Sequence, residues 1–208
     1  ALHEAGAIEA TGHKVITVDS ADGKLRVEHL KSVLLAHSDV PHMVKPKMVY
    51  ISNSTEVGTV YRKQELIQIS KFCKEHNLYL FMDGARLASA LASSECDITL
   101  ADLAQLTDVF YIGGTKSGAL LGEAIVINNP HLQIDFSYHI KQKGALLAKG
   151  QLIGIQFLVL FQRNLIFNLA LQANAMAAKL TKGFMEGGFT FLTTSVTNQI
   201  FPILPNSV

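Results

Sequence analysis

Short apolar runs alternate with amphipathic stretches along the first part of the chain. Five runs have strand length and are rich in β-branched and aromatic residues: Lys14–Val18, Lys47–Ile51, Leu78–Met82, Val109–Ile112 and Glu123–Ile127. Before and between them, apolar residues recur at helical spacing in Glu4–Thr11, Val27–His37, Lys63–Asn77, Gly84–Ser93 and Asp102–Leu106. This alternation predicts an α/β fold with a mostly parallel mixed sheet flanked by helices.

The pattern changes after Pro130. A long helical run extends to about Gly183, and two short strands are expected beyond it, at Phe189–Thr193 and Ile200–Leu204. We therefore expect a large domain in residues 1–150. Residues 151–208 would form a long linking helix and the start of a smaller C-terminal α+β domain.

Composition bears on association and on completeness. Of 208 residues, 49% are hydrophobic and 17% are charged, against a usual quarter charged. Such a chain needs extensive burial, which favours an oligomer interface or a missing segment. The chain starts at Ala1 without a methionine and stops at Val208 in mid-pattern. We therefore expect a fragment that lacks the N-terminal part of its large domain.

Charge and cysteine content exclude several classes of partner. The net charge is +1, from 18 basic and 17 acidic residues, so no basic field indicates a nucleic-acid partner. Leu152–Leu160 is too short and too polar at its end to span a bilayer, so we expect no membrane partner. Cys73 and Cys96 are too few and too far apart for a disulfide framework or a metal site. We expect reduced thiols in a cytoplasmic protein.

Two charged residues follow two of the expected strands. Asp83 comes directly after Leu78–Met82, and Lys116 lies in Gly113-Gly-Thr-Lys-Ser-Gly118, after Val109–Ile112. Ligands of open α/β sheets bind beyond the carboxyl ends of strands, so the two side chains can face one pocket. Pyridoxal phosphate (PLP) needs a lysine amine for its Schiff base and an anion beside its ring nitrogen. The pair therefore predicts a PLP site, although an N-cap aspartate and a solvated lysine are the simpler interpretation of each residue alone.

These residues also resemble a known family, the threonine aldolase and β-eliminating lyase group of PLP enzymes, which has the aspartate aminotransferase fold type. The resembling segments are Met82–Arg86, Gly113–Gly118, His3–Lys14 and Tyr50–Thr59. The resemblance implies that Lys116 forms the Schiff base, that Asp83 pairs with the pyridinium nitrogen, and that Arg86 binds the phenolic oxygen or the substrate side. It also implies a pocket built across a homodimer or homotetramer.

Further candidates lie in loops at strand ends. Asn53, Thr55 and Thr115 carry amide or hydroxyl groups that can meet a cofactor or a substrate, although ordinary turn chemistry explains such residues equally well. Glu56 stands where many threonine aldolases carry a histidine that assists proton removal, and a carboxylate can serve as that base. His3 does not match the histidine that stacks on PLP in the family, because that residue would precede this chain.

Basic side chains at Lys141, Lys143 and Lys149 are able to reach a neighbouring subunit's cofactor phosphate, although solvated lysines are an equal interpretation. A Walker phosphate loop is disfavoured because Thr115 separates Gly114 from Lys116.

The resemblance implies a lyase that cleaves β-hydroxy-α-amino acids by a retro-aldol reaction, converting L-threonine or allo-threonine to glycine and acetaldehyde. A β-eliminating lyase, an aminotransferase and a non-catalytic fragment or scaffold of the same fold remain as alternatives.

Overall fold

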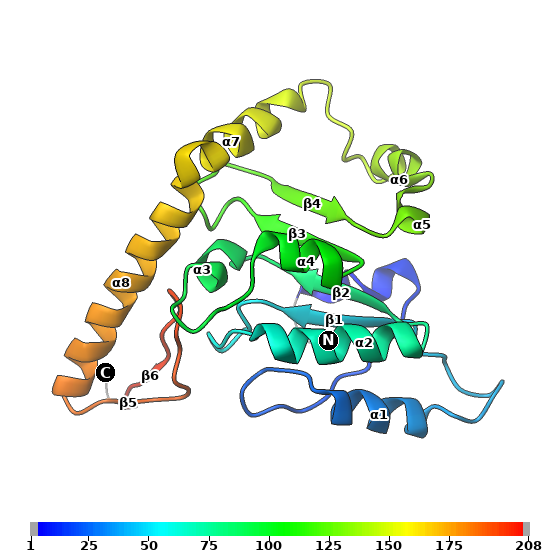
Figure 1. Ribbon diagram of the computed structural model, residues 1–208, viewed down its shortest axis with the longest axis horizontal. Helices are drawn as coiled ribbons and strands as arrows, with labels where there is room; N and C mark the ends of the chain where they lie inside the picture. The colour runs from blue at the N-terminus through cyan, green and yellow to red at the C-terminus, as the bar shows by residue number, and fades with distance from the viewer. Residues whose placement is uncertain (1–3, 206–208) are drawn as a thin grey trace.

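The structure, a computed structural model, describes residues 4–205. Its centre is a four-stranded sheet in the order β1-β2-β3-β4 (Figure 1). The first three strands are parallel, and β4 pairs antiparallel with β3. Their bounds are β1 Met48–Ser52, β2 Tyr79–Asp83, β3 Val109–Gly113 and β4 Glu123–Ile127. The prediction of an α/β fold with a mostly parallel mixed sheet is confirmed.

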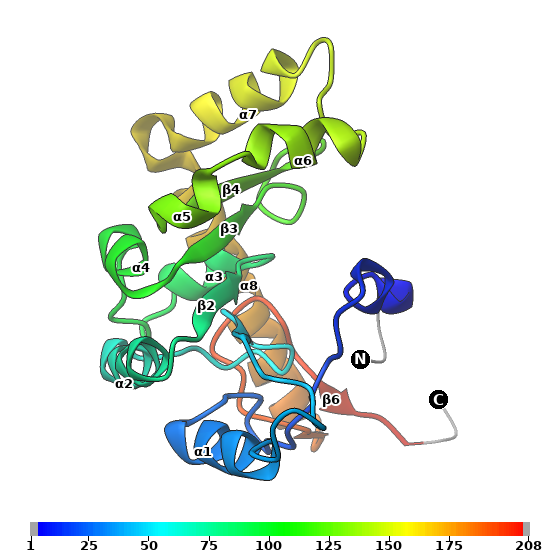
Figure 2. The same cartoon turned by 90° about the vertical axis from the view of Figure 1, so that its right-hand side faces the viewer.

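One face of the sheet forms the core. Alternate strand residues point to it, because successive side chains of a strand lie on opposite faces; they are Val49, Ile51, Leu80, Met82, Phe110 and Ile112. They belong to one apolar cluster with residues of six helices: α1 Val27–Ala36, α2 Lys63–Glu75, α3 Leu87–Leu91, α4 Leu100–Leu106, α7 Gln151–Phe161 and α8 Leu165–Glu186. Figure 2 shows α2 and α4 on one side of the sheet and the N-terminal segment on the other.

The opposite face of the sheet is only partly covered. Tyr50 of β1 is 40% exposed, and Phe81 and Asp83 of β2 are half-buried. Tyr111 of β3 is half-buried on this same face. We call this surface the open face. It places polar and aromatic side chains at the carboxyl ends of three neighbouring strands, where ligands of open α/β sheets bind.

The N-terminal segment differs in part from expectation. The helix expected at Glu4–Thr11 consists of two 3-10 turns, η1 Glu4–Gly6 and η2 Glu9–Thr11. Gly12 ends the second turn at φ 84°, and its N–H donates to the Glu9 carbonyl at 2.9 Å. The strand expected at Lys14–Val18 was wrong, because this segment pairs with no strand within residues 4–205. β-Branched residues favour strands only where a neighbouring strand is available.

The C-terminal part is mostly helical. It contains α5 Pro130–Gln133, α6 Phe136–Gln142, α7 Gln151–Phe161, η3 Gln162–Asn164 and α8 Leu165–Glu186, then the short antiparallel pair β5 Thr190–Phe191 and β6 Pro202–Ile203. Arg163 and Asn164 adopt positive φ and separate α7 from α8. Helix α8 lies along α3, where Asn174 donates to the Ser89 carbonyl at 2.9 Å. The division at residue 150 stays a prediction.

The apolar stretch Leu152–Leu160 belongs to a longer helical run, Gln151–Glu186. By length and composition alone this run is able to cross a membrane, and 17% of its most apolar window is buried. The backbone break at Arg163 and Asn164 divides it into helices of 11 and 22 residues. Ile166 and Ala170 in the second helix are buried in the same apolar cluster as the sheet. The absence of a membrane partner stays a prediction.

Candidate active site

Asp83 is the last residue of β2, and its carboxylate faces the open face of the sheet. The Tyr50 hydroxyl, from β1, donates to Oδ2 at 2.5 Å. The Tyr111 hydroxyl, from β3, donates to Oδ1, and the Ala85 N–H donates to the same oxygen at 2.9 Å. Hydrogen-bond donors from both neighbouring strands and from the following turn therefore fix the carboxylate.

Both tyrosines keep their protons in this environment. Burial raises the pKa of Tyr50, and the hydrogen bond to Asp83 raises it further, with added contributions from the charges of Glu56 and Glu4. Burial and the same carboxylate also raise the pKa of Tyr111. A phenol beside a carboxylate resists ionisation because a second negative charge is unfavourable there. The two hydroxyls therefore act as donors to Asp83 across the physiological pH range.

The loop that carries Lys116 follows β3 and is held by Glu123 of β4. The Gly114 N–H donates to Oε2 of Glu123 at 2.7 Å, and the Thr115 hydroxyl donates to Oε1 at 3.1 Å. The Lys116 side chain is exposed, and within residues 4–205 its ammonium forms no hydrogen bond or ion pair. The expected cofactor contact of Thr115 stays a prediction, since its hydroxyl is engaged by Glu123 here.

The Lys116 loop begins beside the turn that follows Asp83. The Gly113 N–H donates to the Gly84 carbonyl at 2.8 Å. A Cβ atom on Gly113 would lie 2.1 Å from the Ala85 carbonyl oxygen, so only glycine permits this approach. The close contact brings the chain after β3 against the chain after β2. The expected neighbourhood of the two strand ends is thus present.

Arg86 lies three residues beyond Asp83, at the start of α3. It is half-buried, and its guanidinium has no polar partner in the part of the chain that the structure describes. An unpaired amine, an unpaired guanidinium and a fixed carboxylate therefore belong to two adjoining strand-end loops. PLP presents a carbonyl, a phenolic oxygen and a ring nitrogen, so the donor and acceptor set fits this cofactor.

The loop after β1 buries two of the expected cofactor ligands. Asn53 is 0% exposed, and its Oδ1 accepts a hydrogen bond from the Tyr61 N–H at 3.2 Å. Thr55 is 1% exposed, and its hydroxyl is 2.7 Å from the Thr59 hydroxyl. Both side chains shape the loop itself, and their assignment as cofactor ligands stays a prediction. Glu56 is exposed at the tip of this loop.

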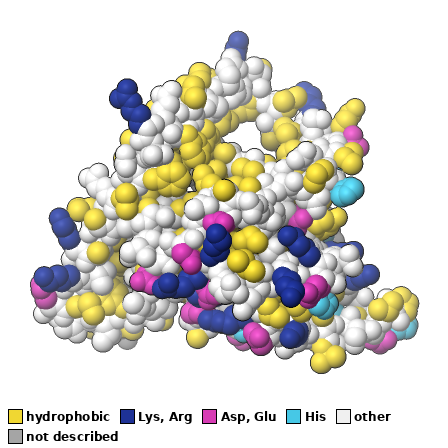
Figure 3. Space-filling view, viewed as in Figure 1, with side chains coloured by type: hydrophobic (Ala, Val, Ile, Leu, Met, Phe, Trp, Pro, Cys, Tyr) yellow, Lys and Arg dark blue, Asp and Glu magenta, His cyan; other side chains and the backbone are white. Residues whose placement is uncertain are grey.

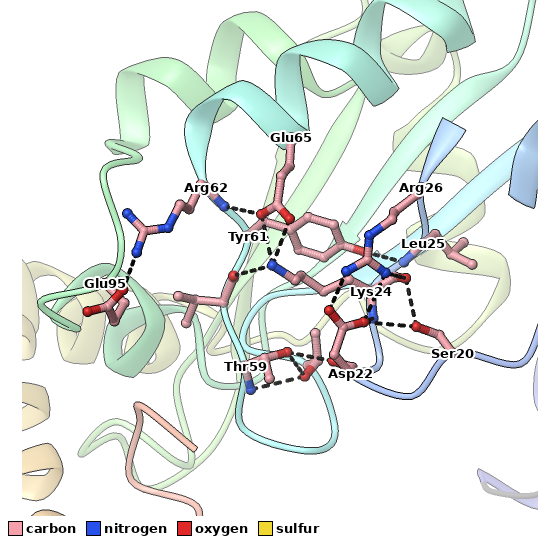
Figure 4. A network of polar contacts seen from close by, with 12 residues as sticks. Ser20, Asp22, Lys24, Leu25, Arg26, Thr59, Tyr61, Arg62, Glu65 and Glu95 are labelled. Atoms are coloured by element: carbon pink, nitrogen blue, oxygen red, sulfur yellow. Dashed lines mark hydrogen bonds and ion pairs between the residues drawn. The ribbon is translucent and has the colours of Figure 1, made fainter. Parts of the chain in front are cut away.

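A polar network holds this loop against the segment before α1 (Figure 4). The Lys24 ammonium bridges Glu65 at 2.7 Å and the Val60 carbonyl at 3.3 Å. The Thr59 hydroxyl donates to the Asp22 carbonyl at 2.7 Å, and the Leu25 N–H donates to the Tyr61 hydroxyl, also at 2.7 Å. The network fixes the end of this loop, at Thr59, Val60 and Tyr61, and lies outside the site.

The family model described as beta-eliminating lyase matches residues 1–206. The chain belongs to the beta-eliminating lyase family. The resemblance inferred from the motifs is therefore confirmed.

Several relatives of this lyase-family chain carry the name threonine aldolase. The chain is 40% identical over 182 residues to a low specificity L-threonine aldolase of a Pseudomonas species. The match covers 86% of this chain and 52% of that protein. The corresponding Pseudomonas aeruginosa protein is 37% identical over 181 residues, with the same coverage. The chain thus spans about half the length of the curated relatives that it matches.

Solved structures agree with the family assignment. A structure of Leishmania major threonine aldolase is 57% identical, with a TM-score of 0.96, and the match covers 99% of this chain and 60% of that one. A putative aromatic amino acid beta-eliminating lyase/threonine aldolase from Exiguobacterium has a TM-score of 0.72 at 23% identity, which establishes the fold alone.

Sequence reasoning on this family member missed Tyr50, Tyr111 and Glu123 as contributors to the site. Strand alternation was the available signal, because Tyr50 and Tyr111 share a face with Asp83. Of the other candidates, His3 lies outside the described residues. The side chains of Lys141, Lys143 and Lys149 are exposed, on α6 or after it, and their expected contact with a neighbouring cofactor stays a prediction.

Proposed function

We propose that the protein is a PLP-dependent carbon–carbon lyase that cleaves β-hydroxy-α-amino acids, with L-threonine or allo-threonine giving glycine and acetaldehyde. The supporting observation is the fixed Asp83 carboxylate beside the loop of an unpaired lysine, Lys116. The similarity to threonine aldolases supports this reaction over others of the same fold.

Three side chains would hold the cofactor. Lys116 Nζ would bind its carbonyl carbon, Asp83 would accept a hydrogen bond from the N–H of its protonated ring nitrogen, and Arg86 would donate to its phenolic oxygen. When bound, PLP supplies an electron sink for the negative charge left on Cα as the Cα–Cβ bond breaks. Asp83 is suited to its role because three hydrogen-bond donors fix the position of its carboxylate.

Glu56 would take the proton of the substrate hydroxyl at one of its carboxylate oxygens. It is exposed at the loop tip, and within residues 4–205 its carboxylate has no hydrogen-bond partner. Its charge contributes to the raised pKa of Tyr50, which supports a position on the same side of the sheet as Asp83. A carboxylate in reach of the hydroxyl is a competent general base.

The decisive experiment is an absorbance scan of the full-length protein with PLP, before and after borohydride, followed by acetaldehyde assay on both threonine isomers. We expect a band near the visible edge in the wild type that Lys116→Ala abolishes and that Lys71→Ala, at an exposed position of α2, leaves unchanged. Asp83→Asn should retain some PLP and lose most turnover. A wild-type protein without the band, or a Lys116→Ala protein that keeps it, would remove the cofactor assignment.

β-Elimination is the second candidate, and the name of the matching family favours it. The same preparations distinguish the two reactions. Acetaldehyde released from threonine without a keto acid supports the aldolase. Release of ammonia and a keto acid from a β-substituted amino acid supports the eliminating lyase, whereas a requirement for an added keto acid indicates an aminotransferase.

We also propose a homodimer or homotetramer in the cytoplasm. Figure 3 shows hydrophobic side chains gathered over α7 and the start of α8. Leu120, in the loop before β4, is 91% exposed. Other exposed apolar residues of this region are Leu121, Leu146, Leu147, Leu152, Ile155, Leu158 and Leu169. Contiguous apolar surface of this kind indicates association. Light scattering on the full-length protein tests the oligomeric state, and a monomer would contradict the proposed homodimer or homotetramer.

A further inference from the structure

The oxygens of the Asp83 carboxylate are not equally occupied. Oδ1 accepts two hydrogen bonds, from the Tyr111 hydroxyl and the Ala85 N–H. Oδ2 accepts one, from the Tyr50 hydroxyl at 2.5 Å. An ionised carboxylate has about four acceptor positions, two on each oxygen. Counting donors from residues 4–205, the remaining acceptor position is therefore on Oδ2.

The two phenols are held in place by more than these hydrogen bonds. The Tyr50 ring stacks on Phe81 with a centroid separation of 5.1 Å and an interplanar angle of 16°. The Tyr111 ring lies 6.2 Å from the same Phe81 ring, on the neighbouring strand. All four side chains belong to the open face of the sheet. The orientation of the carboxylate is thus set by three strands at once.

We propose that Tyr50 and Tyr111 are positioning residues that fix the Asp83 carboxylate so that the free acceptor position of Oδ2 meets the ring N–H of the cofactor. This inference rests on the proposed function. Tyr50 acts on the oxygen that would bind the ring nitrogen. Tyr111 acts on the oxygen that also keeps the Ala85 N–H. Loss of the Tyr50 hydroxyl should therefore have the larger effect on cofactor binding.

The expected effect follows from the strength of a hydrogen bond to a charged group. Loss of such a bond changes the equilibrium between the fixed and the unfixed carboxylate by roughly tenfold or more, and only the fixed carboxylate is oriented for the ring N–H. Tyr50→Phe keeps the ring and its stacking but removes the donor. We expect PLP to bind about tenfold more weakly to Tyr50→Phe and less than about fivefold more weakly to Tyr111→Phe.

The test measures dissociation constants of the full-length apoprotein for PLP and for the PLP analogue that carries C–H in place of the ring nitrogen. The analogue cannot bond Asp83, so Tyr50→Phe and the wild type should bind it equally, within about twofold. Tyr79→Phe is the matched control. Tyr79 lies on β2 and, like Tyr50 and Tyr111, on the open face, but its hydroxyl has no partner within residues 4–205. The control variant should bind PLP as the wild type does.

Two results would overturn the inference. The first is Tyr50→Phe binding PLP as tightly as Tyr79→Phe does. The second is an equal loss for PLP and the analogue, which would indicate packing or direct contact instead of action through Asp83. If Tyr50→Phe fails to fold, Tyr111→Phe is measured with the same two ligands. The inference requires that it bind PLP more weakly than the wild type does and bind the analogue equally well. A wild type that binds neither ligand refutes the proposed function instead.

Discussion

Replacing Gly84 by alanine should separate β2 from β3 next to Asp83. A Cβ atom on Gly84 would lie 1.7 Å from the Tyr111 carbonyl oxygen and 2.9 Å from its carbonyl carbon. Contacts below 3.0 Å are essentially absent from real structures, so the backbone of β3 must retreat by more than an ångström. The movement would stretch the 2.8 Å hydrogen bond from the Gly113 N–H to the Gly84 carbonyl.

The cost can be worked from these contacts. Overpacking of a tight core typically lowers the free energy of unfolding by about 1–3 kcal/mol. Loss of one backbone hydrogen bond adds about 1 kcal/mol, and the smaller entropy of the unfolded alanine chain returns roughly 0.4–1 kcal/mol. We expect Gly84→Ala to lower the free energy of unfolding by about 1–3.5 kcal/mol.

Urea unfolding followed by circular dichroism measures this change in the full-length protein. Gly154→Ala is the matched control, because a methyl group there meets nothing within 4 Å in α7. Alanine is the better helix former by about 1 kcal/mol, so the control should unfold at an equal or higher urea concentration. Equal midpoints for Gly84→Ala and the wild type would refute the close approach of the two strands.

Three further outcomes follow from buried or paired groups. The bond to Lys63 lowers the pKa of Asp102 to about 2, so its stabilising effect should be present above about pH 4 and disappear as the pH falls toward 2. The melting-temperature difference between wild type and Asp102→Asn should shrink over that interval, and a constant difference contradicts the ion pair. Burial raises the pKa of the Cys73 thiol to about 12. In the Cys96→Ser variant, a maleimide should therefore label Cys73 only after denaturation. Rapid labelling of the native protein would contradict the burial of this thiol. Leu66 is 0% exposed, so Leu66→Ala should lower the free energy of unfolding by about 2–5 kcal/mol, measured by urea titration. An unchanged urea midpoint would contradict the burial of this side chain.

The strands of the sheet could be predicted closely from sequence, because each is a short apolar run with turn residues at its ends. The run Glu123–Ile127 matches β4 at both ends, and Leu78–Met82 begins and ends one residue before β2. Lys14–Val18 has the same local pattern but no neighbouring strand. Pairing is a property of the fold, so the local pattern could not exclude this segment.

The site could be predicted in part. Asp83 ends β2 and Lys116 follows β3, the neighbouring strand, and the rule for ligands at strand ends places such residues together. The tyrosine donors were missed because their approach to Asp83 depends on the strand order β1-β2-β3. That order is set by packing over separations of 28 and 33 residues, and no local pattern specifies it.

The two outer strands of the sheet carry a practical consequence. Within residues 4–205, β1 has a partner only in β2, and β4 has a partner only in β3. Each outer strand presents unsatisfied backbone groups that are able to template the addition of another strand. Copies of this chain would be prone to associate edge to edge. Light scattering of the 208-residue chain should therefore rise with concentration, and peptides that pair with an outer strand should suppress the rise.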